Sequence, residues 1–177
     1  CTELGLELVE DDGACPLLAA PIGTDATETA LKLGVDSQRL VCIDPLGSLE
    51  KRVVLMMAPG ADSQAADKVA AGIIANGRAA TLIRDSAGFV GQRLAAMVSN
   101  LGCFMADIGL ASPADIDTAM RLGLNYPKGP LEIADHLGVD TVFTIMQEMH
   151  NISGDDRYRP SLWLRRHARL GLSIWEE

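Results

Sequence analysis

Apolar and polar positions follow different periods in the two halves of the chain. Up to residue 85, short apolar runs typical of strands alternate with segments whose apolar residues lie three or four positions apart. Beyond residue 85, every long apolar segment has the helical period. The pattern therefore predicts a small α/β layer over residues 1–85, followed by an all-helical domain over residues 86–177.

In the first half, strands are expected wherever apolar residues alternate or run together: residues 3–9, 39–44, 53–57 and 79–83. Helices are expected from a capping Thr24 or Asp25 to Leu33, before a terminating Gly34, and from a capping Ser63 towards Gly77. Strands that alternate with helices indicate some parallel pairing in the sheet.

An α/β layer of this kind often binds a dinucleotide, so its glycine spacing matters. The dinucleotide fingerprint G-x-G-x-x-G needs two glycines two positions apart, for the tight turn and the close approach of the pyrophosphate. None of the 17 glycines of this chain has that spacing. The sequence therefore predicts an α/β layer with a structural role, and no cofactor bound by this chain.

The second half begins with a long helix, expected to be capped by Asp85 or Ser86 and to pack against several others. Its apolar stripe is Val90, Leu94, Met97, Val98, Leu101, Met105 and Ile108. Residues 112–115 (SPAD) combine a capping serine, a proline at the first helical position and an early acidic residue, so a second helix should start there and run to Gly123. Further helices are expected from Pro130, Asp140 and Ser161.

Composition narrows the class of protein. A net charge of −9 makes nucleic acid or an anionic membrane surface an unsuitable general partner, and no apolar run approaches the roughly 18 residues of a membrane span. The four cysteines have no CxxC spacing and lie mostly among apolar residues, which favours reduced, buried thiols and a cytoplasmic location. Because the chain opens at Cys1 on an expected strand, we expect it to be a piece of a longer protein.

Four segments in the second half resemble the C-terminal domain of the 3-hydroxyacyl-CoA dehydrogenase family. Residues 85–94 (DSAGFVGQRL) resemble its D-S-P-G-F-V-x-N-R-L start, and residues 111–120 (ASPADIDTAM) resemble its next motif. Residues 122–131 (LGLNYPKGPL) look like its G-x-x-Y-P-x-G-P-L signature, and residues 157–166 (RYRPSLWLRR) like its Y-R-P-S-x-x-L-R-R ending. The resemblance is specific for residues 85–170.

The resemblance implies an NAD-dependent oxidation of 3-hydroxyacyl-CoA to 3-ketoacyl-CoA, in which a His paired with a Glu acts as the base. Those positions fall near Val41 or Cys42 and near Val54, and no His precedes His136. Gln92 stands at the family's substrate-site Asn and is the one candidate catalytic residue; an exposed polar residue is its plainer interpretation. The pattern resembles the second half of double-length bacterial 3-hydroxybutyryl-CoA dehydrogenases, whose upstream unit would carry the chemistry. The resemblance implies a reduced Rossmann-like domain over residues 1–85 and a second helical domain over residues 86–177.

Three further expectations complete the sequence picture. No metal site is predicted, because His136 lies near a helix end, and His150 and His167 are expected on helix surfaces with no Cys, Asp or second His at metal-ligand spacing. The long apolar helix suggests packing against the upstream catalytic unit of the same chain, or self-association, in the way that single-unit members of the family dimerise. The alternative is a non-catalytic assembly module or acyl-CoA-binding module, which sequence upstream of Cys1 would distinguish by the presence or absence of the glycine fingerprint and the His/Glu pair.

Overall fold

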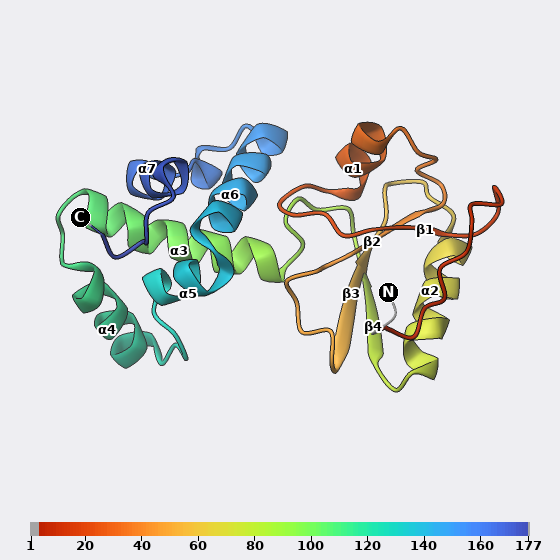
Figure 1. The fold of residues 1–177 in the computed structure, drawn as a ribbon, viewed down its shortest axis with the longest axis horizontal. Coiled ribbons are helices and arrows are strands. Elements are labelled where there is room, and N and C mark those ends of the chain that lie inside the picture. The colour runs from red at the N-terminus through yellow and green to blue at the C-terminus, as the bar shows by residue number, and fades with distance from the viewer. Residues whose placement is uncertain (1–3, 177) are drawn as a thin grey trace. The chain divides into compact units, whose positions relative to one another are not determined.

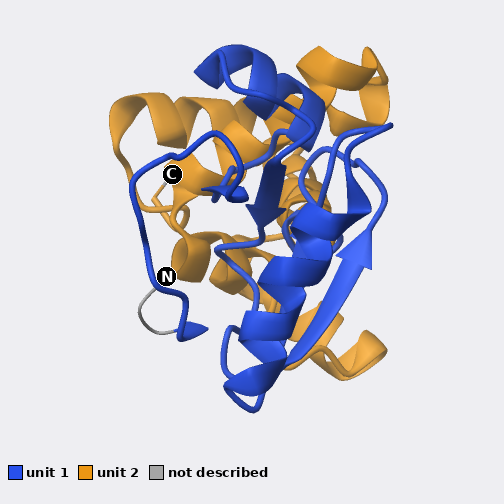
Figure 2. Cartoon of the chain, turned by 90° about the vertical axis from the view of Figure 1, so that its right-hand side faces the viewer, with its two compact units in different colours: residues 1–92 blue, residues 93–177 orange. Residues whose placement is uncertain are grey.

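The computed structural model of the protein describes residues 4–176. The chain divides into two compact units at the bond between Gln92 and Arg93 (Figure 2). The first unit contains the four strands and two helices, and the second is helical (Figure 1). This architecture confirms the expected fold class, a reduced Rossmann-like layer followed by a helical domain. Among the described residues, none of the helices is long and apolar enough to cross a membrane.

The sheet of the first unit has the order β1-β2-β3-β4. Its strands are β1 (Leu17–Ala19), β2 (Leu40–Ile43), β3 (Arg52–Met56) and β4 (Ala79–Ile83). The pairs β1–β2 and β3–β4 are parallel and β2–β3 is antiparallel. Each parallel pair is bridged by one helix, α1 (Ala26–Leu33) or α2 (Ser63–Ala75), so the expected mixture of parallel pairing and helices is confirmed.

The two faces of the sheet are buried against different partners. In β2, Val41 and Ile43 face the side of α2, where Val69 and Ile73 join them in one apolar cluster. Leu40 and Cys42 point to the opposite side and pack with Ala26 and Ala30 of α1 and with Phe89. This period of two is the reason a short apolar run can be a strand buried on both faces.

The strand expected at residues 3–9 is wrong where the structure describes it, because residues 4–9 form no strand and Glu3 lies outside the described part. The side chains of Leu8 and Val9 are 71% and 63% exposed. Alternation of apolar and polar residues is not sufficient for a strand, because residues 4–9 pair with no neighbouring strand. The sheet begins instead at β1, which has only three residues and therefore shows no alternation in its sequence.

The helical unit is built from α3 (Gly91–Asp107), which starts at the end of the first unit, and from the helices that follow it. These are α4 (Pro113–Leu124), α5 (Pro130–Leu137), α6 (Val139–Ser153), the 3-10 turn η2 (Asp156–Tyr158) and α7 (Leu162–Leu170). Ser112 and Ser161 cap α4 and α7 as the sequence predicts. The helix α4 ends later than expected, at Asn125 in the left-handed conformation and not at Gly123.

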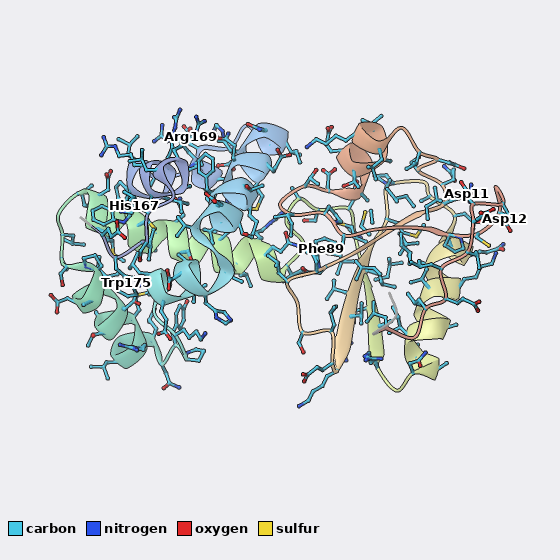
Figure 3. The ribbon with its side chains drawn as sticks, viewed as in Figure 1. Asp11, Asp12, Phe89, His167, Arg169 and Trp175 are labelled. Carbon is cyan, nitrogen blue, oxygen red and sulfur yellow. The ribbon has the colours of Figure 1, made fainter. Side chains whose placement is uncertain are left out.

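The expected start of α3 at Asp85 or Ser86 is also wrong. Gly88 and Phe89 have φ angles of 72° and 47°, which no α-helix contains, so the helix begins only at Gly91. The left-handed turn carries Phe89 (labelled in Figure 3) into the core beside α1. Asp85 caps a different helix: its carboxylate accepts hydrogen bonds from the backbone N–H groups of Ala26 and Thr27, at the start of α1.

The long helix α3 has two unlike faces. The buried face carries small residues: Ala96, Ser99, Gly102, Cys103 and Ala106. It packs closely, since a Cβ at Gly102 would lie 2.5 Å from Cβ of Pro130 in α5. Part of the predicted apolar stripe lies on the other face, where Leu94, Leu101 and Ile108 are 59%, 52% and 55% exposed. Met97, Val98 and Met105 of the same stripe are partly buried, so the described helices cover only part of it.

Candidate functional site

Gln92, the one candidate catalytic residue, is only 1% exposed, so its interpretation as an exposed polar residue is wrong. Its Oε1 accepts a hydrogen bond from the backbone N–H of Gly23 at 2.8 Å. Its Nε2 donates to the carbonyl oxygen of Pro21 at 3.2 Å and to Oδ1 of Asp44 at 2.9 Å. The amide group thus ties the first turn of α3 to the β1–α1 loop and to the end of β2.

Asp44 is the residue of this cluster that the sequence did not single out. It is buried, directly after β2, and the same Oδ1 also accepts from the backbone N–H of Leu46. The carboxylate lies so close to the start of α3 that a Cβ at Gly91 would be 3.4 Å from Oδ2. The only sequence signal was an acidic residue followed by Pro45 at the end of a buried strand, which reads equally well as a turn.

The positions at which the family places its His and Glu lie in the sheet. Val41 and Cys42 in β2 are fully buried, and Val54 in β3 is partly exposed. Burial raises the pKa of the Cys42 thiol to about 12, and it does the same for Cys103 in α3. At neutral pH these thiols are therefore protonated and poor nucleophiles. Free thiols at residues 15, 42 and 103 agree with the expected reduced cysteines, while Cys1 lies outside the described residues.

The helix that follows β1 does not fit a dinucleotide. A pyrophosphate binds the free N–H groups at the N-terminus of such a helix, but at α1 two carboxylates occupy them. Asp25 accepts from the N–H of Glu28, and Asp85 from those of Ala26 and Thr27. Burial, together with the nearby charge of Asp85, raises the pKa of Asp25. A third carboxylate, Asp62, caps α2 in the same manner, so neither helix start suits an anion.

Arg157, Arg159 and Arg165 line a cavity of about 700 Å³ between α3, α6 and α7. Two of them are paired with carboxylates: Arg157 with Asp155 at 2.6 Å and Arg159 with Asp156 at 3.9 Å. The hydrogen bond from Arg157 lowers the pKa of Asp155 to about 2. Asn100 fastens the loop between η2 and α7, donating to the carbonyl oxygen of Arg159 and accepting from the N–H of Ser161. The charges around this cavity are thus largely neutralised from within.

The remaining candidate residues are not brought together. Within residues 4–176, no group of three or more His, Cys, Asp or Glu side chains could hold a metal ion. Glu132 forms an ion pair with Arg121 at 3.4 Å, which is typical of a solvated helix face. His167 was expected on a helix surface, but it is buried, and its contacts are considered below.

The fold places the chain among proteins in which a reduced Rossmann-like layer precedes a helical domain. The family model of the 3-hydroxyacyl-CoA dehydrogenase C-terminal domain matches residues 88–173. Residues 88–173 are therefore a C-terminal domain of the 3-hydroxyacyl-CoA dehydrogenase type, which confirms the resemblance seen in the motifs.

Two curated relatives illustrate the similarity. A probable 3-hydroxybutyryl-CoA dehydrogenase of Bacillus subtilis is 39% identical over 95 residues, covering 54% of this chain and 33% of its own length. The 3-hydroxyadipyl-CoA dehydrogenase of Escherichia coli is 33% identical over 144 residues, covering 81% of this chain and 30% of its own. The chain spans about a third of the length of these relatives.

Solved structures agree in fold. The 3-hydroxybutyryl-CoA dehydrogenase of Escherichia coli superposes with a TM-score of 0.75 and 31% identity, over 94% of this chain and 37% of that one. The (S)-3-hydroxybutyryl-CoA dehydrogenase of Ralstonia eutropha superposes with a TM-score of 0.76 and 26% identity, over 88% and 56%. Because the match to the first includes almost all of this chain, the similarity extends beyond the helical domain into the α/β layer.

Proposed function

We propose that this chain is the C-terminal part of a longer NAD-dependent 3-hydroxyacyl-CoA dehydrogenase, which oxidises a 3-hydroxyacyl-CoA to the 3-ketoacyl-CoA. In this proposal an upstream unit of the same polypeptide binds NAD and performs the chemistry. The portion described here serves assembly. The names of the relatives and their greater length support the proposed parent.

The observation that carries the assembly role is the exposed apolar face of α3. Leu94, Leu101 and Ile108 repeat at intervals of seven residues, so their side chains form one stripe along the helix. Burying one leucine contributes about 1.5–3 kcal/mol, and a stripe of this kind on a soluble protein marks an interaction surface. We infer that it packs against a second helical domain, either that of the upstream unit or, in the isolated chain, that of another copy.

Two features support a non-catalytic role. The amide of Gln92 is fully engaged by Gly23, Pro21 and Asp44, so it has no free group to offer a substrate carbonyl. The sequence also supplies no histidine before His136 to act as the base.

We expect no dehydrogenase activity from the isolated chain. The measurement is the oxidation of NADH in the presence of acetoacetyl-CoA, with an active 3-hydroxybutyryl-CoA dehydrogenase as the positive control. The rate with the isolated chain should not rise above the uncatalysed rate at any substrate concentration. Saturable turnover that disappears in Gln92→Ala would contradict the proposal and would make Gln92 a catalytic residue.

The assembly role predicts that Leu101→Glu weakens self-association of the isolated chain by at least about tenfold, because a charged group cannot be buried unpaired in an apolar contact. Sedimentation over a concentration series measures the dissociation constant. The matched control is Leu31→Glu, at an exposed position on α1, which should leave association unchanged. A wild-type chain that stays monomeric at high concentration would count against the proposed packing.

A further inference from the structure

The segment after α7 folds back on that helix and is fastened to it by hydrogen bonds. The N–H of Leu172 donates to the carbonyl oxygen of His167 at 3.0 Å. The indole Nε1 of Trp163 donates to the carbonyl oxygen of Ile174 at 3.1 Å, and the Ile174 side chain is fully buried. Figure 3 labels His167 on α7 and Trp175 in this segment. Residues 172–176 are therefore a packed part of the helical unit.

His167 makes the last of these attachments, and both of its ring nitrogens face carbonyl oxygens. Nδ1 lies 2.7 Å from the carbonyl oxygen of Trp163, and Nε2 lies 2.7 Å from that of Glu176. A carbonyl oxygen only accepts hydrogen bonds, whereas a neutral imidazole carries a single N–H. Both contacts are hydrogen bonds only when the ring carries two protons and a positive charge.

The surroundings of His167 contain groups of both signs. Asp135, at the end of α5, and Asp140, at the start of α6, line the same cavity of about 390 Å³ as His167. These carboxylates bring negative charge to the same cavity, and the stacked indole of Trp163, 4.7 Å away between ring centroids, presents its electron-rich face to the imidazole. The neighbouring Arg166 and Arg169 on α7 act in the opposite sense, although Arg166 is turned to Asp107.

We propose that residues 172–176 form a proton-dependent latch, closed when His167 is doubly protonated and loosened when it loses one proton. The bond to Trp163 joins residues four apart on one helix and survives with the single remaining N–H. The bond to Glu176 is the one that is lost, because it joins the ring to a separate segment beyond the helix, whereas Trp163 lies one turn earlier on the same helix. The latch is therefore closed while the ring carries both protons, and it loosens when the pH is raised far enough to remove one of them.

The direct test is NMR spectroscopy of the imidazole nitrogens of the full 177-residue chain at about pH 5.5 and about pH 8. Two N–H groups are expected on His167 at the lower pH and one, on Nδ1, at the higher. Over the same interval, the exchange of the Trp163 indole proton and the Glu176 amide proton should accelerate about tenfold beyond the intrinsic effect of pH, as expected for the loss of one charge-assisted hydrogen bond.

Substitution of each of the three histidines in turn shows which of them causes the pH-dependent change in proton exchange. His167→Gln should show fast exchange at both pH values, since its amide cannot donate to both carbonyl oxygens with the same geometry. His136→Gln and His150→Gln should retain the full pH dependence. The proposal is overturned if the wild-type chain shows equal protection at both pH values, if His167 holds a single N–H throughout, or if either control variant abolishes the change. The wild-type spectra decide the matter even where the His167→Gln chain does not fold.

Discussion

Replacing Asp117 with alanine is expected to lower the free energy of unfolding by about 3 kcal/mol. The Asp117 carboxylate in α4 accepts hydrogen bonds from the backbone N–H groups of Leu131 and Glu132, at 2.8 and 2.9 Å. Each bond to a charged acceptor contributes about 1.5 kcal/mol or more, and its loss would leave a buried donor unsatisfied. The charge also lies at the N-terminus of α5, where the helix dipole favours it.

Urea unfolding followed by circular dichroism measures this effect. The control is Asp140→Ala, which removes an exposed carboxylate in the first turn of α6 and should change stability by less than about 1 kcal/mol. Asp117→Asn keeps one acceptor oxygen and should fall between the two. Equal stability of the Asp117→Ala and Asp140→Ala chains would show that the bonds to α5 contribute little.

The contact between Asp117 and the start of α5 lies where two of the family motifs meet, residues 111–120 and 122–131. Asp117 lies at 2% exposure beneath the turn that precedes α5, and a Cβ at Gly129 would overlap its side chain. Pro130, with no N–H of its own, then starts the helix whose next two N–H groups the carboxylate holds. The first motif (residues 116–119, IDTA) thus supplies the carboxylate, and the second (residues 126–131, YPKGPL) supplies the helix start that the carboxylate binds. Both motifs have a structural role in joining α4 to α5.

The sequence predicted most of the elements because their local signals agree with the final packing. Asp25 and Gly34 bound α1, and Ser161 caps α7, as side-chain capping and left-handed glycine require. Local sequence signals gave the wrong element where a side chain binds a residue far away in the sequence. Asp85 looked like the cap of α3, yet its carboxylate binds the start of α1, nearly 60 residues earlier in the chain.

The helical period identified α3 but could not say which side faces the core. The apolar stripe pointed to Leu94 and Leu101, while the domain interior accepts the small residues Ala96, Gly102 and Ala106. Close approach to Pro130 selects small side chains on the inner face. Large apolar side chains on the outer face, such as Leu94 and Leu101, contribute to stability only when another surface covers them. The exposed stripe therefore supports the proposed assembly role.

Candidate chemistry was the least predictable part. The resemblance located Gln92, but neither its burial nor its bond to Asp44 could be read from residues 48 positions apart. The sequence predicted His167 on a helix surface, whereas the returning segment around Ile174 covers it. Both errors have the same origin: burial of a polar side chain depends on partners that the local pattern does not contain.

Replacing Gln92 with glutamate is expected to destabilise the first unit by more than about 3 kcal/mol at pH 7. The substitution exchanges a donor for an acceptor that faces Oδ1 of Asp44 at 2.9 Å and the carbonyl oxygen of Pro21 at 3.2 Å. It also buries a second unpaired negative charge beside Asp44, for which burial and repulsion are both unfavourable. The folded state therefore binds a proton at this pair more tightly than the unfolded chain does.

The proton bound by the carboxyl pair of the Gln92→Glu variant determines how the free energy of unfolding depends on pH. Because the introduced carboxyl has a higher pKa in the folded state, its penalty is present at neutral pH and is relieved as the pH falls through that value. Urea unfolding at about pH 7 and about pH 5 should show partial recovery at the lower pH. The control is Gln92→Met, of similar size and uncharged, which should lose about 2 kcal/mol at both pH values because the N–H of Gly23 is left unpaired. A glutamate variant as stable as the methionine variant at pH 7 would show that Gln92 and Asp44 do not form a buried hydrogen bond. The proposed non-catalytic role of Gln92 would then lose its main support.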